Sequence, residues 1–228
     1  MAKRRKAIDE DEESTGKEWK EAELIETFGL NRIKEYQTPL MKEWLDVSLP
    51  TLTVGEQEIF DQKHKEAINN LEGWSEEDLK MKFITYVLYL GWLRDENGIV
   101  GYFDKMISAT IEGTKLKVKS DFMLAKGLLN VHKKPYFHFQ EYKPQLNPHG
   151  EPMAQLLEAF LIGQTKNGIG TPLYGVEIIG KQWTFVIMES KDYCSSKSYD
   201  STDKDDLLKI ISILRKFKEI LMTRLILM

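Results

Sequence analysis

The stretch Tyr-Phe-His-Phe-Gln-Glu-Tyr-Lys occupies residues 136–143 and closes an aromatic run with an acid and a lysine. Side chains alternate between the two faces of a β-strand, so Phe137, Phe139, Glu141 and Lys143 are expected to share one face. An isolated charge is costly in such apolar surroundings. Glu141 and Lys143 are therefore expected to pair with another group or to belong to a functional site.

The segments around this strand predict the rest of a sheet. Residues 99–112 read as a strand, and in the next one Leu116 and Val118 alternate with lysines, which predicts one solvated face. Asp121, near the end of this strand, is expected on the same face as the lysines. After the strand at 135–143, we expect a helix over 151–164 and a hairpin over 173–189 that folds at Gly180-Lys181.

The helices are indicated by their N-terminal caps. Thr53 with Glu56, and Ser75 with Asp78, have the spacing at which each side chain binds the other residue's backbone N–H. Short helical patterns also lie between Trp19 and Leu45. We expect longer helices over 54–71, 75–92 and 203–227.

The order of these elements predicts an α/β protein with a mixed sheet and helices on both faces. No glycine-rich phosphate loop follows any expected strand, which argues against a Rossmann fold. Residues 1–16 carry a basic and then an acidic cluster and are expected to form a disordered tail. We expect a helical segment over 17–74 and an α/β domain over 75–228.

The composition restricts the classes of function. The chain has 228 residues and a formal net charge of −4, which allows a local basic groove but no general positive coat. Cys194 is the single cysteine, so an intramolecular disulfide is excluded. No apolar run approaches the roughly 20 residues of a membrane-spanning helix, and no secretory signal opens the chain. We expect a cytoplasmic protein that makes no use of a membrane.

Asp121, Glu141 and Lys143 are the residues that suggest chemistry. Mg²⁺ binds hard oxygen ligands and needs only one or two protein carboxylates. Asp121 and Glu141, at the ends of neighbouring strands, are candidate ligands for Mg²⁺ or Mn²⁺, with the backbone carbonyl of Tyr142 as a third. Lys143 is a candidate to orient or deprotonate water and to balance charge on a phosphate.

Asp121 followed by Glu141-x-Lys143 resembles the metal-binding motif of the PD-(D/E)xK nuclease superfamily, which has the restriction-endonuclease-like fold. That fold has a core of one helix, a three-strand meander, a helix and a strand, the order expected for residues 75–190. The resemblance extends to stand-alone bacterial members related to the nuclease domains of type I restriction enzymes. It implies a metal-dependent endonuclease or exonuclease that acts on DNA in restriction, defence or repair.

The resemblance also suggests further site residues. Gln155 corresponds to a glutamine that some branches carry on the helix after the lysine strand, although Ala159 stands where those branches often have a tyrosine. Glu77 corresponds to an acid that some members use beside the metal, and Ser120 replaces the proline of the motif. Lys117 and Lys119 are candidate phosphate contacts, on the same strand face as Asp121.

Simpler interpretations remain open at this stage. Glu141 and Lys143 could simply form a surface ion pair. Lys117 and Lys119 could simply belong to a solvated strand face. The alternative function is a non-catalytic module that keeps the nuclease fold and serves in nucleic-acid binding or in assembly. A protein partner is a separate candidate source of specificity. A third alternative is a purely structural partner. Its apolar surface would be the end helix, where Leu221, Leu225, Ile226 and Leu227 look poorly covered and could form a homodimer.

Overall fold

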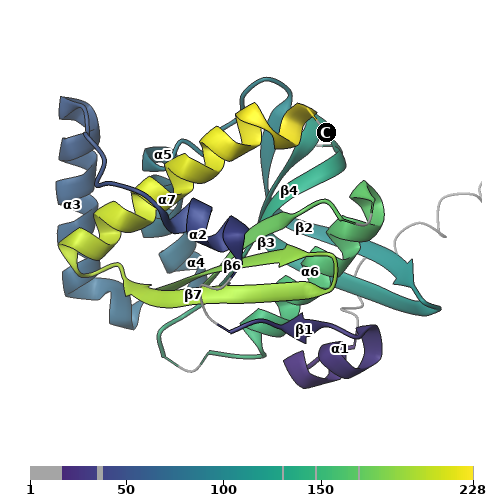
Figure 1. Cartoon of the computed structure of the whole chain (residues 1–228). Coiled ribbons are helices and arrows are strands. Elements are labelled where there is room, and N and C mark those ends of the chain that lie inside the picture. The colour runs from purple at the N-terminus through teal and green to yellow at the C-terminus, as the bar shows by residue number, and fades with distance from the viewer. Residues whose placement is uncertain (1–16, 35–37, 130, 147, 169, 228) are drawn as a thin grey trace, which may run out of the picture.

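The computed structural model describes residues 17–34, 38–129, 131–146, 148–168 and 170–227. The expected tail over 1–16 lies outside the described residues. One seven-stranded sheet forms the centre of the protein, with the strand order β1-β7-β6-β5-β4-β3-β2 (Figure 1). The strands are β1 (Asn31–Arg32), β2 (Ile99–Ile111), β3 (Thr114–Leu128), β4 (Val131–Lys143), β5 (Leu173–Ile179), β6 (Gln182–Glu189) and β7 (Asp192–Asp200).

The sheet is mixed. Strands β2, β3 and β4 form an antiparallel meander, and β5 then lies parallel to β4 after the crossover helix α6 (Pro152–Asn167). Strands β5, β6 and β7 are antiparallel neighbours, and the two residues of β1 pair with β7 in parallel. The expected α/β class with a mixed sheet is confirmed.

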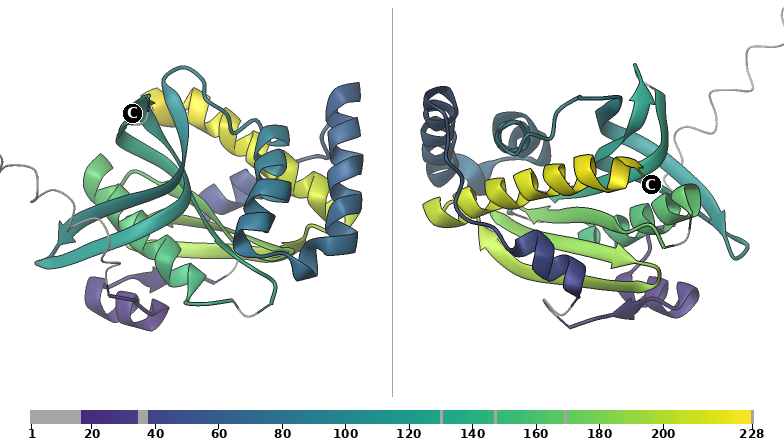
Figure 2. Two further views of the ribbon diagram at one scale, coloured as in Figure 1. Left: turned by 180° about the vertical axis from the view of Figure 1, so that it is seen from behind. Right: turned by 45° about the horizontal axis from the view of Figure 1, so that its top comes forward.

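Helices cover both faces of the sheet (Figure 2). Helix α6 packs on one face together with α1 (Glu21–Phe28), and the remaining helices pack on the other. These are α2 (Pro39–Leu45), α3 (Val54–Asn70), α4 (Glu76–Leu79), α5 (Thr85–Leu90) and α7 (Lys204–Thr223), with a π-helical turn over Lys80–Ile84 and 3₁₀ turns over Leu71–Gly73 and Leu225–Leu227. The sheet therefore separates two apolar cores. No helix in the described part of the chain is long and apolar enough to span a membrane.

The local signals predicted several element boundaries well. Thr53 and Glu56 form the expected capping box at the start of α3, and Ser75 and Asp78 form another at the start of α4. The hairpin between β5 and β6 turns at Gly180, whose positive φ of 55° suits a residue without a side chain. These boundaries follow from local hydrogen bonds and local backbone conformation.

Strand β7 is the main element that the sequence did not predict. Cys194 is buried in this strand and pairs with Ile187 of β6. The sequence of β7 contains mostly serine, lysine, aspartate and tyrosine, which gives little apolar alternation. Pairing with β6 forms the strand where its own sequence does not indicate one.

The aromatic strand is longer than expected and contains an irregularity. β4 begins at Val131 instead of residue 135, and its pairing with β3 shifts register near Ala125, so that Tyr136 and His138 face consecutive residues of β3. Phe137 is the extra residue of this bulge. It packs in the core under α7, whereas Phe139 packs under α6, so the expectation that the two share a face was wrong.

The end of the last helix is better covered than expected. Leu221 and Leu225 are buried, and Ile226 packs against the same core. The side chain of Leu227 lies outside the described residues. Leu221, Leu225 and Ile226 therefore do not form the exposed apolar surface that we expected, because they pack into the core on this face of the sheet.

Trp44 on α2 occupies the centre of the core beneath α7. Its side chain is fully buried, and its indole N–H donates a hydrogen bond of 2.9 Å to the carbonyl of Ile213. The indole also makes edge contacts with the rings of Tyr174 and Phe185, at centroid distances of 5.0 and 5.2 Å. It thus ties α2 to α7 and to two strands of the sheet.

We expect Trp44→Ala to lower the free energy of unfolding by about 3–5 kcal/mol, because it leaves a cavity and removes the hydrogen bond to the Ile213 carbonyl. Urea denaturation measures this change. Leu49→Ala, at an exposed position, is the control and should stay within about 0.5 kcal/mol. A similar small change in both variants would contradict the assignment of Trp44 to the central core.

Candidate active site

Asp121 of β3 and Glu141 and Lys143 of β4 lie together at one end of the meander. All three side chains are buried, with exposed fractions of 4%, 3% and 7%. Strand β3 brings Asp121 next to the end of β4, where its Oδ2 accepts a hydrogen bond of 2.7 Å from the backbone N–H of Tyr142. The structure thus brings together the three residues of the expected motif. Because Glu141 and Lys143 are buried, the interpretation of the two as a surface ion pair is wrong.

The ammonium group of Lys143 is the centre of this cluster. It donates hydrogen bonds to Glu141 Oε1 at 2.7 Å and to the carbonyl oxygen of Tyr142 at 2.9 Å. Burial alone would lower the pKa of Lys143, but the carboxylates of Glu141 and Asp121 raise it above the ordinary value. Lys143 is therefore a cation at neutral pH and is poorly suited to deprotonate water in this state.

The two buried acids are held in an unfavourable environment for negative charge. Burial is the main cause that raises the pKa of Asp121 to about 6, with contributions from Glu76 and Asp104 against the opposing effects of Tyr142 N–H and Lys143. Burial also raises the pKa of Glu141 well above its ordinary value, and the charge of Asp121 adds to this. Additional positive charge at this site would favour the ionised form of both acids.

The acid that the preceding helix contributes is Glu76, not Glu77. Glu76 Oε2 lies 3.7 Å from Lys143 Nζ. Glu77 is mostly exposed and forms an ion pair of 2.9 Å with Lys80 on the same helix. The sequence pointed to the first turn of α4 correctly, but the direction of each side chain depends on how the helix packs against the sheet.

Helix α6 contributes two polar side chains to a pocket beside this cluster. Gln155 lines the pocket as expected, and Glu158 also lines it. The pocket has a volume of about 420 Å³ and lies beyond the end of β4, where Lys143 and Glu76 form part of its wall. Sequence reasoning missed Glu158, although an acid three residues after Gln155 on an otherwise apolar helix face was a usable signal.

The two candidate phosphate contacts also line the pocket. Lys119 is exposed and forms an ion pair of 3.0 Å with Asp104 of β2, and Lys117 lies two residues before it. The expected alternation is confirmed here, because Leu116 and Val118 are buried between them. Asp121 has the same parity as these lysines but is buried, since α4 and β4 cover this part of the strand.

A row of polar side chains lies behind the site, on the opposite face of β4. His138, Gln140 and Tyr142 are fully buried. The hydroxyl of Tyr142 donates a hydrogen bond of 2.6 Å to Gln140 Oε1, and Gln140 Nε2 lies 2.9 Å from His138 Nε2. Burial lowers the pKa of His138 to about 3, so its neutral imidazole accepts from the Gln140 amide. This row fixes the side chain of Tyr142, whose backbone contacts Asp121 and Lys143.

The donor set suits a hard divalent cation in its chemistry. Asp121, Glu141 and the Tyr142 carbonyl are oxygen donors, and Mg²⁺ requires no more than one or two carboxylates from the protein. Across the described ranges, no group of three or more His, Cys, Asp or Glu side chains is arranged to hold a metal ion. Lys143 contacts two of the three candidate ligands, so binding of Mg²⁺ or Mn²⁺ would require its ammonium group to move.

Comparison with known proteins does not assign the chain to a family. No protein-family model matches the sequence, and no curated protein matches it at a significant level. The functional argument therefore depends on the fold and on the arrangement of the site residues.

We expect Asp121→Asn to stabilise the protein at about pH 8 by roughly 2 kcal/mol, and the gain to disappear near about pH 4. The pKa of Asp121 is higher in the folded protein than its ordinary value of 3.8, so stability present below pH 4 is lost as the pH rises through about 6. Asparagine stays neutral and can still accept the hydrogen bond from Tyr142. Urea denaturation across this pH range measures the difference.

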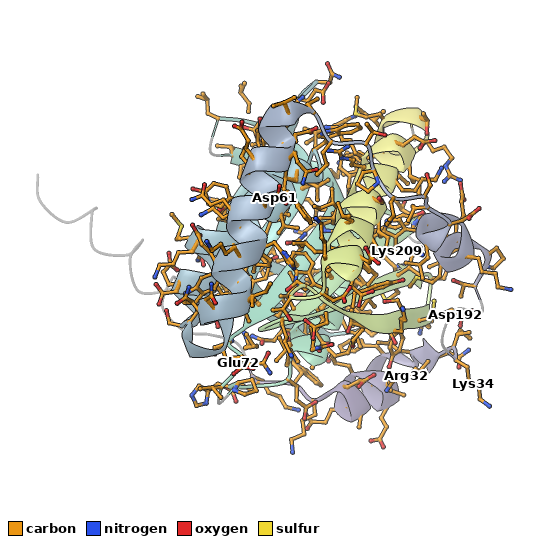
Figure 3. All side chains as sticks on the ribbon, turned by 90° about the vertical axis from the view of Figure 1, so that its left-hand side faces the viewer. Arg32, Lys34, Asp61, Glu72, Asp192 and Lys209 are labelled. Atoms are coloured by element: carbon orange, nitrogen blue, oxygen red, sulfur yellow. The ribbon has the colours of Figure 1, made fainter. Side chains whose placement is uncertain are left out.

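Asp61→Asn is the matched control, because Asp61 lies at an exposed position on α3 (Figure 3). Its effect on the free energy of unfolding should not change in this way with pH. If Asp121→Asn is equally stabilising, or destabilising, at both ends of the range, the buried-charge account of Asp121 is wrong.

Proposed function

We infer that this protein is a metal-dependent nuclease that hydrolyses phosphodiester bonds, with DNA as its substrate. The observation that carries this inference is the buried cluster of Asp121, Glu141 and Lys143 beside an accessible pocket. Two buried carboxylates with raised pKa values are unfavourable unless a cation uses them. A pair of acids next to a lysine is typical of sites that bind a metal and a phosphate.

The topology supports the same inference. Helices α4 and α5, the antiparallel strands β2 to β4, helix α6 and the parallel strand β5 follow one another in the order of a restriction-endonuclease-like core. In that fold the motif residues lie on the second and third strands, as Asp121, Glu141 and Lys143 do here. Fold alone does not determine function, so the topology adds weight only because the site residues coincide with it.

In this proposal each residue has a separate role. Asp121, Glu141 and the carbonyl of Tyr142 would hold Mg²⁺ or Mn²⁺, which supplies a Lewis acid and lowers the pKa of bound water. The Lys143 ammonium would leave the Tyr142 carbonyl and balance negative charge on the phosphate. Gln155 would position water or phosphate from α6. Lys117 and Lys119, with Lys119 released from Asp104, would contact the flanking backbone.

The alternative is a non-catalytic module that binds nucleic acid through the same pocket. The closed ion pair between Lys143 and Glu141 is the observation that favours it, because it satisfies the lysine without a metal. A module of this kind would bind DNA but release no product. Cleavage measurements therefore separate the two functions.

We expect the native protein to cleave plasmid, linear or single-stranded DNA in the presence of Mg²⁺ or Mn²⁺. Lys143→Ala should lower the rate by roughly 100-fold or more, since it removes the charge that faces the phosphate. Lys34→Ala is the control, because Lys34 is an exposed side chain (Figure 3) and does not line the pocket. Equal cleavage by all three proteins would contradict the proposed site. Binding without cleavage would favour the non-catalytic module.

Metal binding can be tested without any substrate. We expect Mn²⁺ to raise the melting temperature of the native protein, because a ligand that binds only the folded state stabilises it. The shift should be lost in Asp121→Asn, which removes a charged ligand and keeps a similar shape. Equal shifts in the two proteins, measured by calorimetry, would show that Mn²⁺ binds elsewhere.

A further inference from the structure

Two side chains of α6 place hydrogen-bond acceptors in the pocket beyond the end of β4. One is Glu158, which has no role in the proposed catalysis, and the other is Gln155, whose amide N–H group would position the phosphate. Glu158 Oε1 and Gln155 Oε1 are buried, and neither has a hydrogen-bond partner among the described residues. The side chain of Glu158 is 96% buried, since its exposed fraction is 4%. Buried oxygen atoms without partners are rare in folded proteins and require an explanation.

Glu158 lies outside the charged cluster at the end of β4. Its pKa is raised to about 8 by burial alone, with no contribution from the charges of Asp121, Glu141 or Lys143. Glu158 is not one of the candidate metal ligands, and the proposed catalysis gives it no role. The pocket is thus lined by the ammonium group of Lys143 and also by the acceptor side chains of Gln155 and Glu158 on α6.

The wall of the pocket also includes an aromatic side chain. Trp19, in the segment before α1, lines it and is half-buried. One neighbour of the indole is Phe28, and the other is the ammonium group of Lys17, 3.9 Å from the ring centre. Because Lys17 is an exposed side chain, a planar ligand could take its place against the ring.

These three features match the parts of one nucleotide. A phosphate carries negative charge, a base presents a flat face to an aromatic ring, and the edge of a base presents N–H donors. A volume of about 420 Å³ lies within the roughly 300–1,000 Å³ range of small-ligand sites. Among the bases, guanine has two adjacent donor groups, N1–H and the N2 amino group, which fit the two oxygens of one carboxyl group.

We propose that this pocket binds a single unpaired guanine of the substrate, with Glu158 and Gln155 accepting hydrogen bonds from its base edge. The inference rests on the proposed function, because it assigns a nucleotide next to the scissile phosphate. It makes Glu158 a specificity residue, not a catalytic one. Pairing in a duplex occupies the same edge of guanine, so the preferred substrate has an unpaired guanine at this position.

Binding without a metal tests the proposal separately from cleavage. Fluorescence anisotropy with EDTA compares oligothymidylates that carry one central guanine, one hypoxanthine or one abasic site. We expect the native protein to bind the guanine oligonucleotide roughly tenfold more tightly than the hypoxanthine one, which lacks only the N2 amino group. The two guanine N–H donors favour the ionised carboxylate of Glu158 over its neutral form. Glu158→Gln should therefore lose this preference, because an amide has one acceptor oxygen and a carboxylate has two.

Glu72→Gln is the charge-matched control and should keep the preference, since Glu72 is exposed just after α3 (Figure 3). Equal affinity of the native protein for guanine and hypoxanthine, or no binding of either, would overturn the proposal. A preference that survives in Glu158→Gln would overturn the role of Glu158. Guanine preference without cleavage would support the guanine site and contradict the nuclease activity. Cleavage without guanine preference would support the nuclease activity and contradict the guanine site.

Discussion

The ion pair between Lys143 and Glu141 is the interaction on which the end of the meander depends. Without the lysine, Glu76, Asp121 and Glu141 would form a group of acids in a region where solvent screens little of their repulsion. The same lysine also binds the Tyr142 carbonyl, so it fixes the backbone between the two charged residues. One side chain therefore neutralises the site and sets the geometry of the strand that carries it.

Helices on both faces of the sheet bury the cluster of Asp121, Glu141 and Lys143. Helices α4 and α6 reach the end of β4 from opposite faces of the sheet. Helix α6 is also the crossover connection that makes β5 parallel to β4. Ligand sites in such sheets commonly lie beyond the carboxyl ends of parallel strands, where the connections diverge. The pocket lies at that place, so the element that closes the topology also supplies Gln155 and Glu158.

The parts of the fold that were predictable from sequence are those with local physical causes. Capping boxes at Thr53 and Ser75 determine where helices begin, and Gly180 determines a turn, each through interactions between neighbouring residues. The bulge at Phe137 and the strand β7 were not predictable, because both arise from pairing with strands distant in the sequence. Glu76 and Glu77 show the same limit, since only the packing of α4 decides which acid faces Lys143.

The sequence by itself determined which chemical groups this protein has and how they are spaced along each element. An acid and a lysine two residues apart share a face wherever the strand is regular, as it is from Phe139 to Lys143. Gln155 and Glu158 share a helix face because of the helix period. Only the tertiary structure decided that Lys143, Gln155 and Glu158 line one pocket and that Asp121 lies next to the strand end that carries Lys143. Their distances depend on strand register, on the bulge and on the crossover, which involve contacts between residues far apart in the chain.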